Sequence, residues 1–179
     1  MKKGLRILAI AIIAIISLAV ALRVIGFRSM RYEQGKDSMS PTIAGGDICL
    51  SIINKQYLSV ELKPGMIVLL RHKNYSHLLT KRIIALGGDL VQIQGSSTVV
   101  NGLTLDEPYL GTASMTKELG DVKKIRIPPD KLFVMGDNRD NSMDSRFSQF
   151  GLIDVNQVVG KPLLVLWSQD KKKIGKWLQ

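Results

Sequence analysis

Residues 131–146 read KLFVMGDNRDNSMDSR, a short apolar run followed directly by a dense polar loop. The run from Lys131 to Met135 is rich in residue types that favour a β-strand. The loop from Gly136 to Arg146 holds three aspartates, two arginines, two asparagines and two serines. We interpret this density as a hydrogen-bonded shell that orients another group. A calcium loop is the alternative, but the D-x-N-x-D spacing lacks the glycine and terminal glutamate of an EF-hand.

Similar apolar runs occur on both sides of this stretch. β-Branched and apolar residues gather at 47–53, 66–71, 78–85, 90–94 and 163–167, and Gly, Pro, Asn and Asp separate the runs. After the N-terminal segment, nothing keeps a helical apolar stripe for three turns. The pattern predicts a mostly β fold, a sandwich or a barrel. Residues 95–128 are the most polar and turn-rich, and we expect them to form a smaller inserted lobe.

The N-terminal segment is apolar behind a basic start. Three basic residues among the first six precede an uncharged run of 16 residues, Ile7 to Leu22, and Arg23 separates this run from an apolar stretch ending at Phe27. A membrane span needs about 20 residues, but an arginine can snorkel to the interface. The segment therefore predicts a membrane anchor with its N-terminus inside. A cleaved signal peptide is the alternative, because Ala19-Val20-Ala21 resembles an A-x-A cleavage site.

The charge balance indicates an anionic partner. The formal net charge is +10, which suits nucleic acid or an anionic membrane surface. Neither zinc-finger spacing nor an RNP-type motif occurs, so we favour the membrane and expect no nucleic-acid partner. The tail, residues 171–179, carries four lysines and Trp177. It either rests on lipid headgroups or is a frayed, solvated end.

Two residue types that often carry catalysis are poorly placed here. Cys49 is the single cysteine, which excludes an intrachain disulfide, and we expect it to be a small buried apolar residue. His72 and His77 lie in the polar stretch RHKNYSH, and we expect both at the surface. Neither a G-x-S-x-G nor an H-E-x-x-H pattern accompanies them. A histidine triad and a zinc site are therefore weak hypotheses.

A serine and a lysine are better candidates. Ser38 lies in DSMSPTI, where Pro41 forbids a regular strand or helix interior; read alone, it is an ordinary turn serine. In TKRIIALGGD, strand alternation puts Lys81 and Arg82 on opposite faces, so one of these cations points where apolar residues point. A lysine held among apolar groups has a lowered pKa and becomes a general base. The alternative is an edge strand from which both cations snorkel.

Taken in order, the three segments resemble the hallmarks of bacterial type I signal peptidase, also called leader peptidase, a Ser/Lys dyad serine protease family. These hallmarks read S-M-x-P-T, K-R-x-x-G-x-x-G-D and G-D-N-R-x-N-S-x-D-S-R, and they correspond to residues 38–42, 81–89 and 136–146. PGMIV at 64–68 is also similar, although the family usually has an acidic residue in place of Met66. NG at 101–102 and EPY at 107–109 fit as well. The resemblance covers roughly residues 5–168.

The resemblance implies a role for each residue that matches. It makes Ser38 the nucleophile and Lys81 its general base, with the Ser142 hydroxyl orienting the lysine. Residues that support the site, by this hydrogen bond or by the ion pairs Asp144–Arg146 and Asp137–Arg82, would be Ser142, Asp144, Arg146, Asp137 and Arg82. Residues that line or border the substrate pocket would be Met39, Ile43, Leu79 and Thr80.

The resemblance also implies a fold and an activity. The fold is an N-terminal transmembrane helix (1–27), an antiparallel β-sheet catalytic core (28–94 and 129–170), an inserted second lobe (95–128) and the basic tail (171–179). The activity is that of a membrane-bound serine endopeptidase that cleaves signal peptides from exported preproteins after small residues, in an A-x-A pattern. Its partners would be preproteins and the phospholipid membrane, with the catalytic domain on the extracytoplasmic side. No cofactor or metal is implied.

Two departures and two rival hypotheses remain. Lys36 stands two residues before Ser38, where many relatives have Ser or Gly, which leaves the second oxyanion-hole donor open. Ala85 stands where the family often has Gly, a change between small residues. A self-cleaving Ser/Lys protein would carry a DNA-binding helical domain before the serine, whereas here a hydrophobic anchor precedes it. A non-catalytic membrane-anchored β domain would leave the third segment without a purpose.

Overall fold

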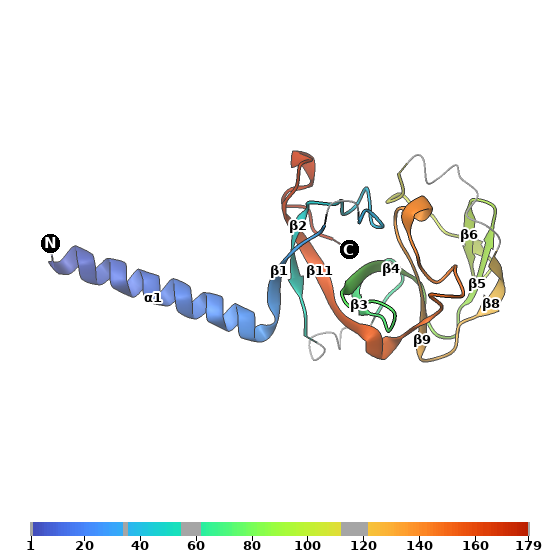
Figure 1. Ribbon diagram of the computed structural model, residues 1–179, viewed down its shortest axis with the longest axis horizontal. Helices are drawn as coiled ribbons and strands as arrows, with labels where there is room; N and C mark the ends of the chain where they lie inside the picture. Colours follow the sequence, from blue (N-terminus) through green and yellow to red (C-terminus); the bar gives the residue numbers. More distant parts are fainter. Residues whose placement is uncertain (1, 34–35, 55–61, 112–121, 179) are drawn as a thin grey trace.

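The computed structural model describes residues 2–33, 36–54, 62–111 and 122–178, and it consists of one long helix beside a β domain (Figure 1). Helix α1, Lys2–Ile25, is exposed along its apolar length. Its residues from Gly4 to Ile25 are long and apolar enough to cross a membrane. The helix ends at Ile25, and at the following Gly26 φ is +110° and a Cβ atom would lie 2.7 Å from the carbonyl oxygen of Ile53. Only glycine fits this junction without strain.

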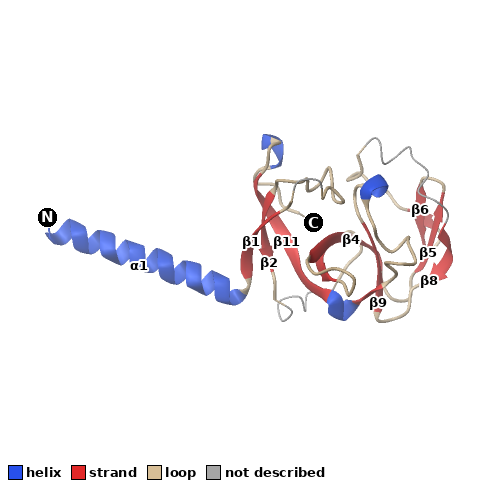
Figure 2. Ribbon diagram, viewed as in Figure 1, coloured by secondary structure: helices blue, strands red, loops and turns tan. Residues whose placement is uncertain are grey.

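The β domain is built on a seven-stranded antiparallel sheet with the order β1-β2-β11-β3-β4-β9-β10. The strands, in sheet order, are Phe27–Arg31, Ile48–Ile52, Val158–Trp167, Ile67–Arg71, Leu78–Ala85, Lys131–Met135 and Ile153–Asp154. Strand β11 carries two register shifts against β2, and such irregularities increase the local bend and twist. Figure 2 shows the sheet curling around the interior of the domain.

A second, four-stranded sheet lies at the end of the domain far from α1 (Figure 1). Its order is β7-β6-β5-β8, with bounds Leu103–Thr104, Ser97–Val100, Leu90–Gln94 and Val122–Arg126. This sheet therefore begins at Leu90, before the start of the proposed inserted lobe at residue 95. The division of the chain into a core and a lobe stays a proposal, and the sheets favour a boundary nearer Leu90.

Strands β4 and β9 are covered on both faces, which is what buries the site described below. Ile83 and Val134 belong to one buried cluster, whereas Ile84 and Phe133 belong to another that also contains β5 residues. Successive side chains of a strand point to opposite faces. The seven-stranded sheet therefore has apolar neighbours on each side of β4, and a charged residue on either face of this strand must be enclosed.

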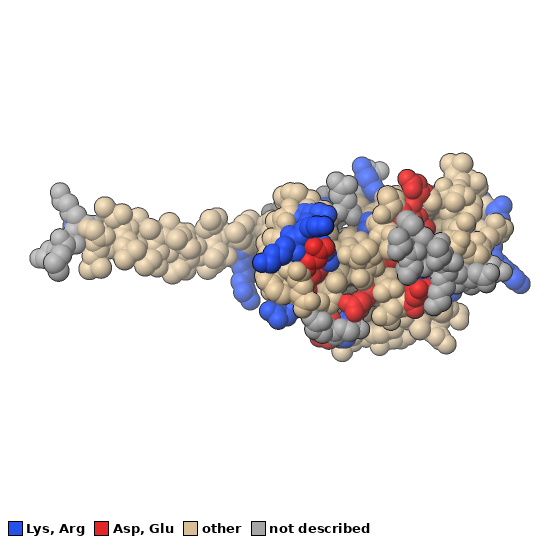
Figure 3. Space-filling model, turned by 90° about the horizontal axis from the view of Figure 1, so that it is seen from above, with Lys and Arg blue, Asp and Glu red and all other residues tan. Residues whose placement is uncertain are grey.

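The mostly β fold is confirmed, and most predicted strands lie where the sequence indicated. Residues 28–31 are polar and basic and carry no strand signal, yet they form most of β1 because they pair with β2. A frayed tail is wrong: Gly175 N–H donates to the Val165 carbonyl at 2.9 Å, and Leu178 N–H to the Leu163 carbonyl at 2.8 Å. Figure 3 shows Lys and Arg side chains gathered where the domain adjoins the apolar helix.

The expected surface position of His72 is also wrong, although His77 is exposed as predicted. His72 is only 3% exposed and stacks on Phe150, with 4.5 Å between the ring centroids. Its Nδ1 accepts from the Asn74 N–H at 3.2 Å, so Nε2 donates to the Phe150 carbonyl at 3.1 Å. Both ring nitrogens are therefore used in a structural contact.

Candidate active site

The loop that carries Ser38 follows β1 and is held by short-range hydrogen bonds. Ser40 N–H donates to the Asp37 carbonyl at 3.0 Å and Ile43 N–H to the Met39 carbonyl at 2.9 Å. The Asp37 carboxylate closes the loop by accepting from Gly45 N–H at 2.6 Å. The loop is thus a folded turn whose apolar side chains are buried, while Ser38 is half-buried.

Lys81 is enclosed within the sheet, and only 3% of its surface is exposed. Its Nζ donates to Ser142 Oγ at 2.8 Å, and that hydroxyl donates to Asp144 Oδ2 at 2.6 Å. Burial lowers the pKa of Lys81 to about 8; the negative charge of Asp144 opposes this change and the positive charge of Arg146 adds to it. At pH 7 about a tenth of this lysine is therefore unprotonated, far more than for a lysine with an ordinary pKa.

Ser38 and Lys81 line the same hollow. This hollow has a volume of about 290 Å³ and is also bordered by Leu79 and Met143. A second hollow of about 250 Å³ shares Ser38 and Leu79 and adds Met39 and Thr80. Four of the five residues expected at the nucleophile or pocket thus lie together around this depression. The fifth, Ile43, is buried against Met39 in a core cluster and is absent from the described lining residues of both hollows.

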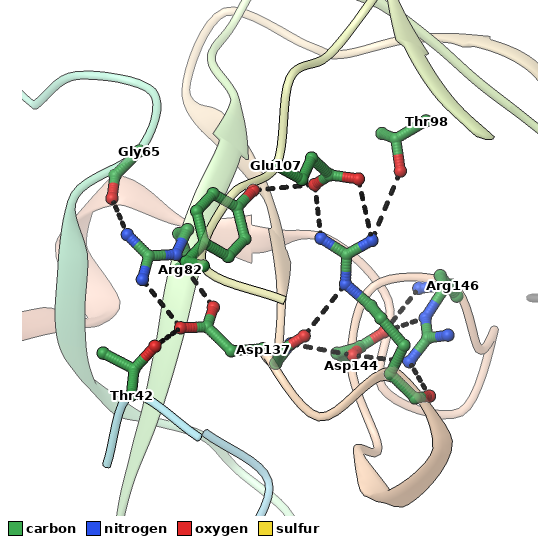
Figure 4. Close-up of polar contacts among 11 residues, drawn as sticks. Thr42, Gly65, Arg82, Thr98, Glu107, Asp137, Asp144 and Arg146 are labelled. Atoms are coloured by element: carbon green, nitrogen blue, oxygen red, sulfur yellow. Dashed lines mark hydrogen bonds and ion pairs between the residues drawn. The ribbon is translucent and has the colours of Figure 1, made fainter. Parts of the chain in front are cut away.

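The opposite face of β4 holds a buried ion pair. Arg82 donates to Asp137 in a bidentate arrangement, Nε to Oδ1 at 2.8 Å and Nη2 to Oδ2 at 2.7 Å. Its Nη1 donates to the Gly65 carbonyl at 2.6 Å, and Thr42 Oγ1 donates to Asp137 Oδ2 at 2.5 Å (Figure 4). The ring of Tyr109 lies 3.9 Å from the guanidinium carbon. Asp137 therefore joins the Ser38 loop to the strand that carries Lys81.

The loop after β9 contains two further pairs. Arg146 donates to both carboxylate oxygens of Asp144, Nε to Oδ1 at 2.8 Å and Nη2 to Oδ2 at 3.0 Å. Arg139 pairs with Glu107 from the segment after β7 and donates from Nε to the Gly136 carbonyl at 3.0 Å. Figure 4 shows these groups converging on the loop from separate segments. Because the side chains are buried, each pair holds its partner segment in a fixed position.

Gly136 allows this loop to approach the serine. A Cβ atom at this position would lie 2.3 Å from the Ser38 carbonyl oxygen and 2.4 Å from Ser142 Oγ. Both distances are far inside van der Waals contact, so a larger residue would separate the two loops. Asn138 N–H donates to the Ser38 carbonyl at 3.0 Å across the same junction. The sequence placed Gly136 at the start of the third segment without indicating this steric role.

Other residues around the site were not found by sequence reasoning. The Glu107–Arg139 pair joins residues 32 positions apart, and only the match of EPY to the family pointed toward it. Tyr32 lines one hollow and accepts a hydrogen bond from Thr80 Oγ1 at 3.2 Å; burial raises the pKa of its phenol well above the usual value. No sequence signal indicated Tyr32.

The remaining candidates have structural roles or lie at the rim. Burial raises the pKa of the Cys49 thiol to about 12, which keeps the thiol protonated. Lys36 lines both hollows, but its Nζ pairs with Glu33 Oε2 at 2.5 Å and its backbone N–H donates to the Glu33 carbonyl at 3.3 Å. Among the described residues, no group of three or more His, Cys, Asp or Glu is placed to hold a metal ion.

The chain combines an apolar helix long enough to cross a membrane, a curled β domain and an enclosed lysine beside a surface hollow. The sequence profile of the family described as "Signal peptidase, peptidase S26" matches residues 5–167. The chain belongs to this family. It is therefore a hydrolase, a serine protease that cleaves signal peptides.

Individual signal peptidases are similar in sequence to this chain over most of their lengths. A signal peptidase I of Bacillus amyloliquefaciens is 37% identical, over 88% of this chain and 85% of the relative. The signal peptidase I S of Bacillus subtilis is 35% identical, over 93% and 91%. The signal peptidase IB of Staphylococcus aureus is 37% identical, over 86% and 87%. A crystal structure of a signal peptidase I from Enterococcus faecalis is 26% identical, with a TM-score of 0.50, over 56% of this chain and 96% of that one.

Proposed function

We propose that this chain cleaves preproteins with a Ser/Lys dyad, Ser38 as nucleophile and Lys81 as general base. Neutral Lys81 takes the proton from Ser38 Oγ as that oxygen attacks the carbonyl carbon of the scissile bond. The protonated lysine then gives its proton to the leaving amine, and an acyl-enzyme remains. Lys81 next removes a proton from water as the water attacks the ester carbonyl, and it returns this proton to Ser38 Oγ when the ester bond breaks.

This proposal rests on the environment of Lys81. The side chain is 3% exposed, lines a hollow with Ser38, and meets the neutral hydroxyl of Ser142 at 2.8 Å. A neutral partner fixes the direction of the amine and stabilises its charged form less than a directly paired carboxylate would. With a pKa lowered to about 8, this lysine can accept a proton under conditions in which an ordinary lysine is almost wholly charged.

The hollows also support cleavage after small residues in an A-x-A pattern. Met39, Leu79 and Thr80 lie on the wall of the hollow that Ser38 shares. Leu79 and Thr80 lie on β4, so an extended substrate segment can run beside this strand with its alternate side chains directed at the wall. We propose that Met39, Leu79 and Thr80 narrow the space beside Ser38, so that small side chains next to the scissile bond are preferred.

The oxyanion site would be formed by donors at and just before Ser38. The Ser38 backbone N–H is one donor to the developing oxyanion. The backbone N–H of Lys36 already donates to the Glu33 carbonyl, and Lys36 Nζ pairs with Glu33 Oε2. An ammonium has three N–H donors, so Lys36 can supply a second donor from Nζ beside that ion pair, or from its backbone N–H if the bond to Glu33 opens. One such donor contributes about 3 to 4 kcal/mol to transition-state stabilisation, so its presence would matter for turnover.

The anchor supports a defined position in the cell. We propose that α1 is retained as a single membrane span, with Met1 in the cytoplasm and the β domain on the extracytoplasmic side, because basic residues near the start favour the inside. The catalytic hollow would then face the side on which the C-terminal end of a signal peptide emerges. Preproteins and the phospholipid membrane would be its partners.

The direct test is processing of a preprotein by purified full-length protein in detergent, with and without the substitution Ser38→Ala. We expect cleavage after a small residue by the wild type and none by the variant. The substitution removes one half-buried oxygen, so circular dichroism should show an unchanged fold. Cleavage of the preprotein by the alanine variant at the wild-type rate would exclude Ser38 as nucleophile. A wild type that cuts only its own chain would favour the self-cleaving alternative.

A further inference from the structure

The C-terminal segment, residues 168–178, packs beside the Ser38 loop although the two are far apart in sequence. The chain returns along the end of β11, where Val165 N–H donates to the Lys176 carbonyl at 3.1 Å and Leu164 pairs with Trp177. This contact brings the segment to the short stretch between the serine loop and β2. The segment lies outside the third hallmark, and the mechanism proposed above makes no use of it.

An ion pair joins the two. Lys173 Nζ lies 2.6 Å from Asp47 Oδ2, and the side chains are 13% and 3% exposed. Asp47 Oδ2 also accepts from the Ala44 N–H at 2.9 Å. Burial raises the pKa of the Asp47 carboxyl, but the bonds from Lys173, Ala44 and Ser168 outweigh that effect and hold it below its ordinary value. The carboxylate is therefore charged and needs its cation.

From Asp47 the connection continues to the serine. Asp47 closes the turn at residues 44–47, since its own N–H donates to the Ala44 carbonyl at 3.1 Å. The next amide of that turn, Gly45 N–H, donates to Asp37 Oδ1 at 2.6 Å. Asp37 directly precedes Ser38. Three short hydrogen bonds or ion pairs therefore lead from Lys173 to the neighbour of the serine.

A separate apolar contact acts on the same loop. Leu178 packs against a buried cluster that includes Met39, the residue after Ser38, together with Ile43 and Val165. The C-terminal segment thus meets the end of the loop through the Lys173–Asp47 pair and, through Leu178, packs against the buried cluster to which Met39 and Ile43 belong. Both contacts would shift if the segment left β11.

We propose that the C-terminal segment, through Lys173 and Leu178, positions the loop that carries Ser38, with Lys173 as a positioning residue that acts through Asp47. This inference rests on the proposed role of Ser38 as nucleophile. A displaced serine would bind substrate as before but react slowly, because covalent attack is sensitive to the placement of the reacting atoms within about 1 Å.

The test compares Lys173→Met with Lys172→Met in the full-length enzyme, using steady-state cleavage of a preprotein. Lys172 is exposed and adjacent, so its variant controls for the loss of one positive charge from the segment. We expect Lys173→Met to lower kcat roughly 10-fold or more, with KM within about twofold of the wild type. Lys173→Arg should restore most of kcat because it keeps the pair with Asp47. Lys172→Met should match the wild type.

A second variant separates positioning from folding. Asp47→Asn should lower kcat by a similar factor, and the double variant with Lys173→Met should be no slower than the worse single variant, since both remove one connection. Additive losses, or equal kcat for Lys173→Met and Lys172→Met, would overturn the inference, as would a loss matched by the unfolded fraction in circular dichroism. Ser38→Ala, measured alongside, distinguishes the two failures: an active alanine variant refutes the proposed nucleophile, whereas an inactive one with normal Lys173→Met refutes the positioning role alone.

Discussion

The two faces of strand β4 give its adjacent cations, Lys81 and Arg82, different hydrogen-bond partners. Arg82 meets a carboxylate through two hydrogen bonds of 2.8 and 2.7 Å, and its charge is fully compensated by Asp137. Lys81, one residue earlier, meets a neutral hydroxyl, and the nearest acid, Asp144, stands behind that hydroxyl and is itself paired with Arg146. Both cations are almost fully buried.

This difference shows how one strand provides both stability and chemistry. A buried charge with a bidentate partner fixes the loops around it. A buried amine without such a partner loses part of its affinity for the proton and becomes able to take one from another group. Which cation takes which role is decided by the segment that each face meets, since the residues themselves are adjacent.

The largest effect should come from removing the base while keeping the charge. Lys81→Arg should lower kcat by roughly 10⁴-fold or more, the order seen when a member of a catalytic unit is lost. A guanidinium does not deprotonate at accessible pH. Single-turnover cleavage of a preprotein measures this loss. An arginine variant with near-normal turnover would mean that Lys81 supplies only a positive charge. Lys81 would then not be a base, and both buried cations of β4 would have structural roles.

On the other face, a substitution should affect stability first. Asp137→Asn leaves Arg82 buried with an incomplete partner, and breaking a buried pair in this way costs about 3 to 5 kcal/mol. Urea denaturation of the full-length protein in detergent checks this value. Asp130→Asn, at an exposed acid, serves as the matched control and should change little. If Asp137→Asn left the unfolding midpoint unchanged, the pair would not be the structural support that we infer.

A smaller loss should follow removal of the hydroxyl between the lysine and Asp144. Ser142→Ala should slow turnover by about 10- to 100-fold, the usual cost of removing a group that orients a functional residue. KM should stay near its wild-type value because Ser142 faces Lys81 and Asp144. Ser148→Ala, at an exposed serine nearby, provides the comparison. Equal rates for the two variants would show that the amine needs no orienting partner.

The smallest effect is expected at the buried thiol. Cys49→Ala should keep most of the activity, and thiol reagents should leave the folded enzyme active, because the thiol is buried and burial raises its pKa to about 12. Cleavage assays before and after treatment with a maleimide check both points. Complete inactivation of a folded Cys49→Ala variant would instead indicate a cysteine nucleophile. Lys81 would then have no serine to activate, and its contrast with Arg82 would have no catalytic meaning.

Much of the fold could be predicted because its strands carry strong local signals. The apolar runs that form β3, β4, β5 and β9 are bounded by Gly, Pro, Asn or Asp. This local composition is enough to predict the buried strands of the sheets. Strand β1 reads FRSMR and has no such signal. It forms because β2 offers an unpaired edge, a property of the assembled sheet. The docking of the tail depends on a non-local contact in the same way.

The site was predictable where neighbours in sequence remain neighbours in space. The density of Asp and Arg in residues 136–146 indicated a hydrogen-bonded shell, and Asp144–Arg146 lies within it. The partner of Arg139 comes from the segment after β7, and that of Asp47 from the C-terminal segment. His72 was misplaced for a similar reason: its polar neighbours suggested the surface, whereas Phe150, 78 residues away, encloses it.

If a neutral Lys81 acts as the base, its titration should appear in the pH dependence of turnover. A protonated lysine cannot accept the serine proton, so kcat should be low in acid and rise as the amine loses its proton. We predict one ascending limb with a midpoint near 8, the value to which burial lowers the pKa of Lys81, when preprotein cleavage is measured between about pH 6 and 10. A limb centred near 6.5, as for a histidine, or a profile without any limb across this range would contradict the account.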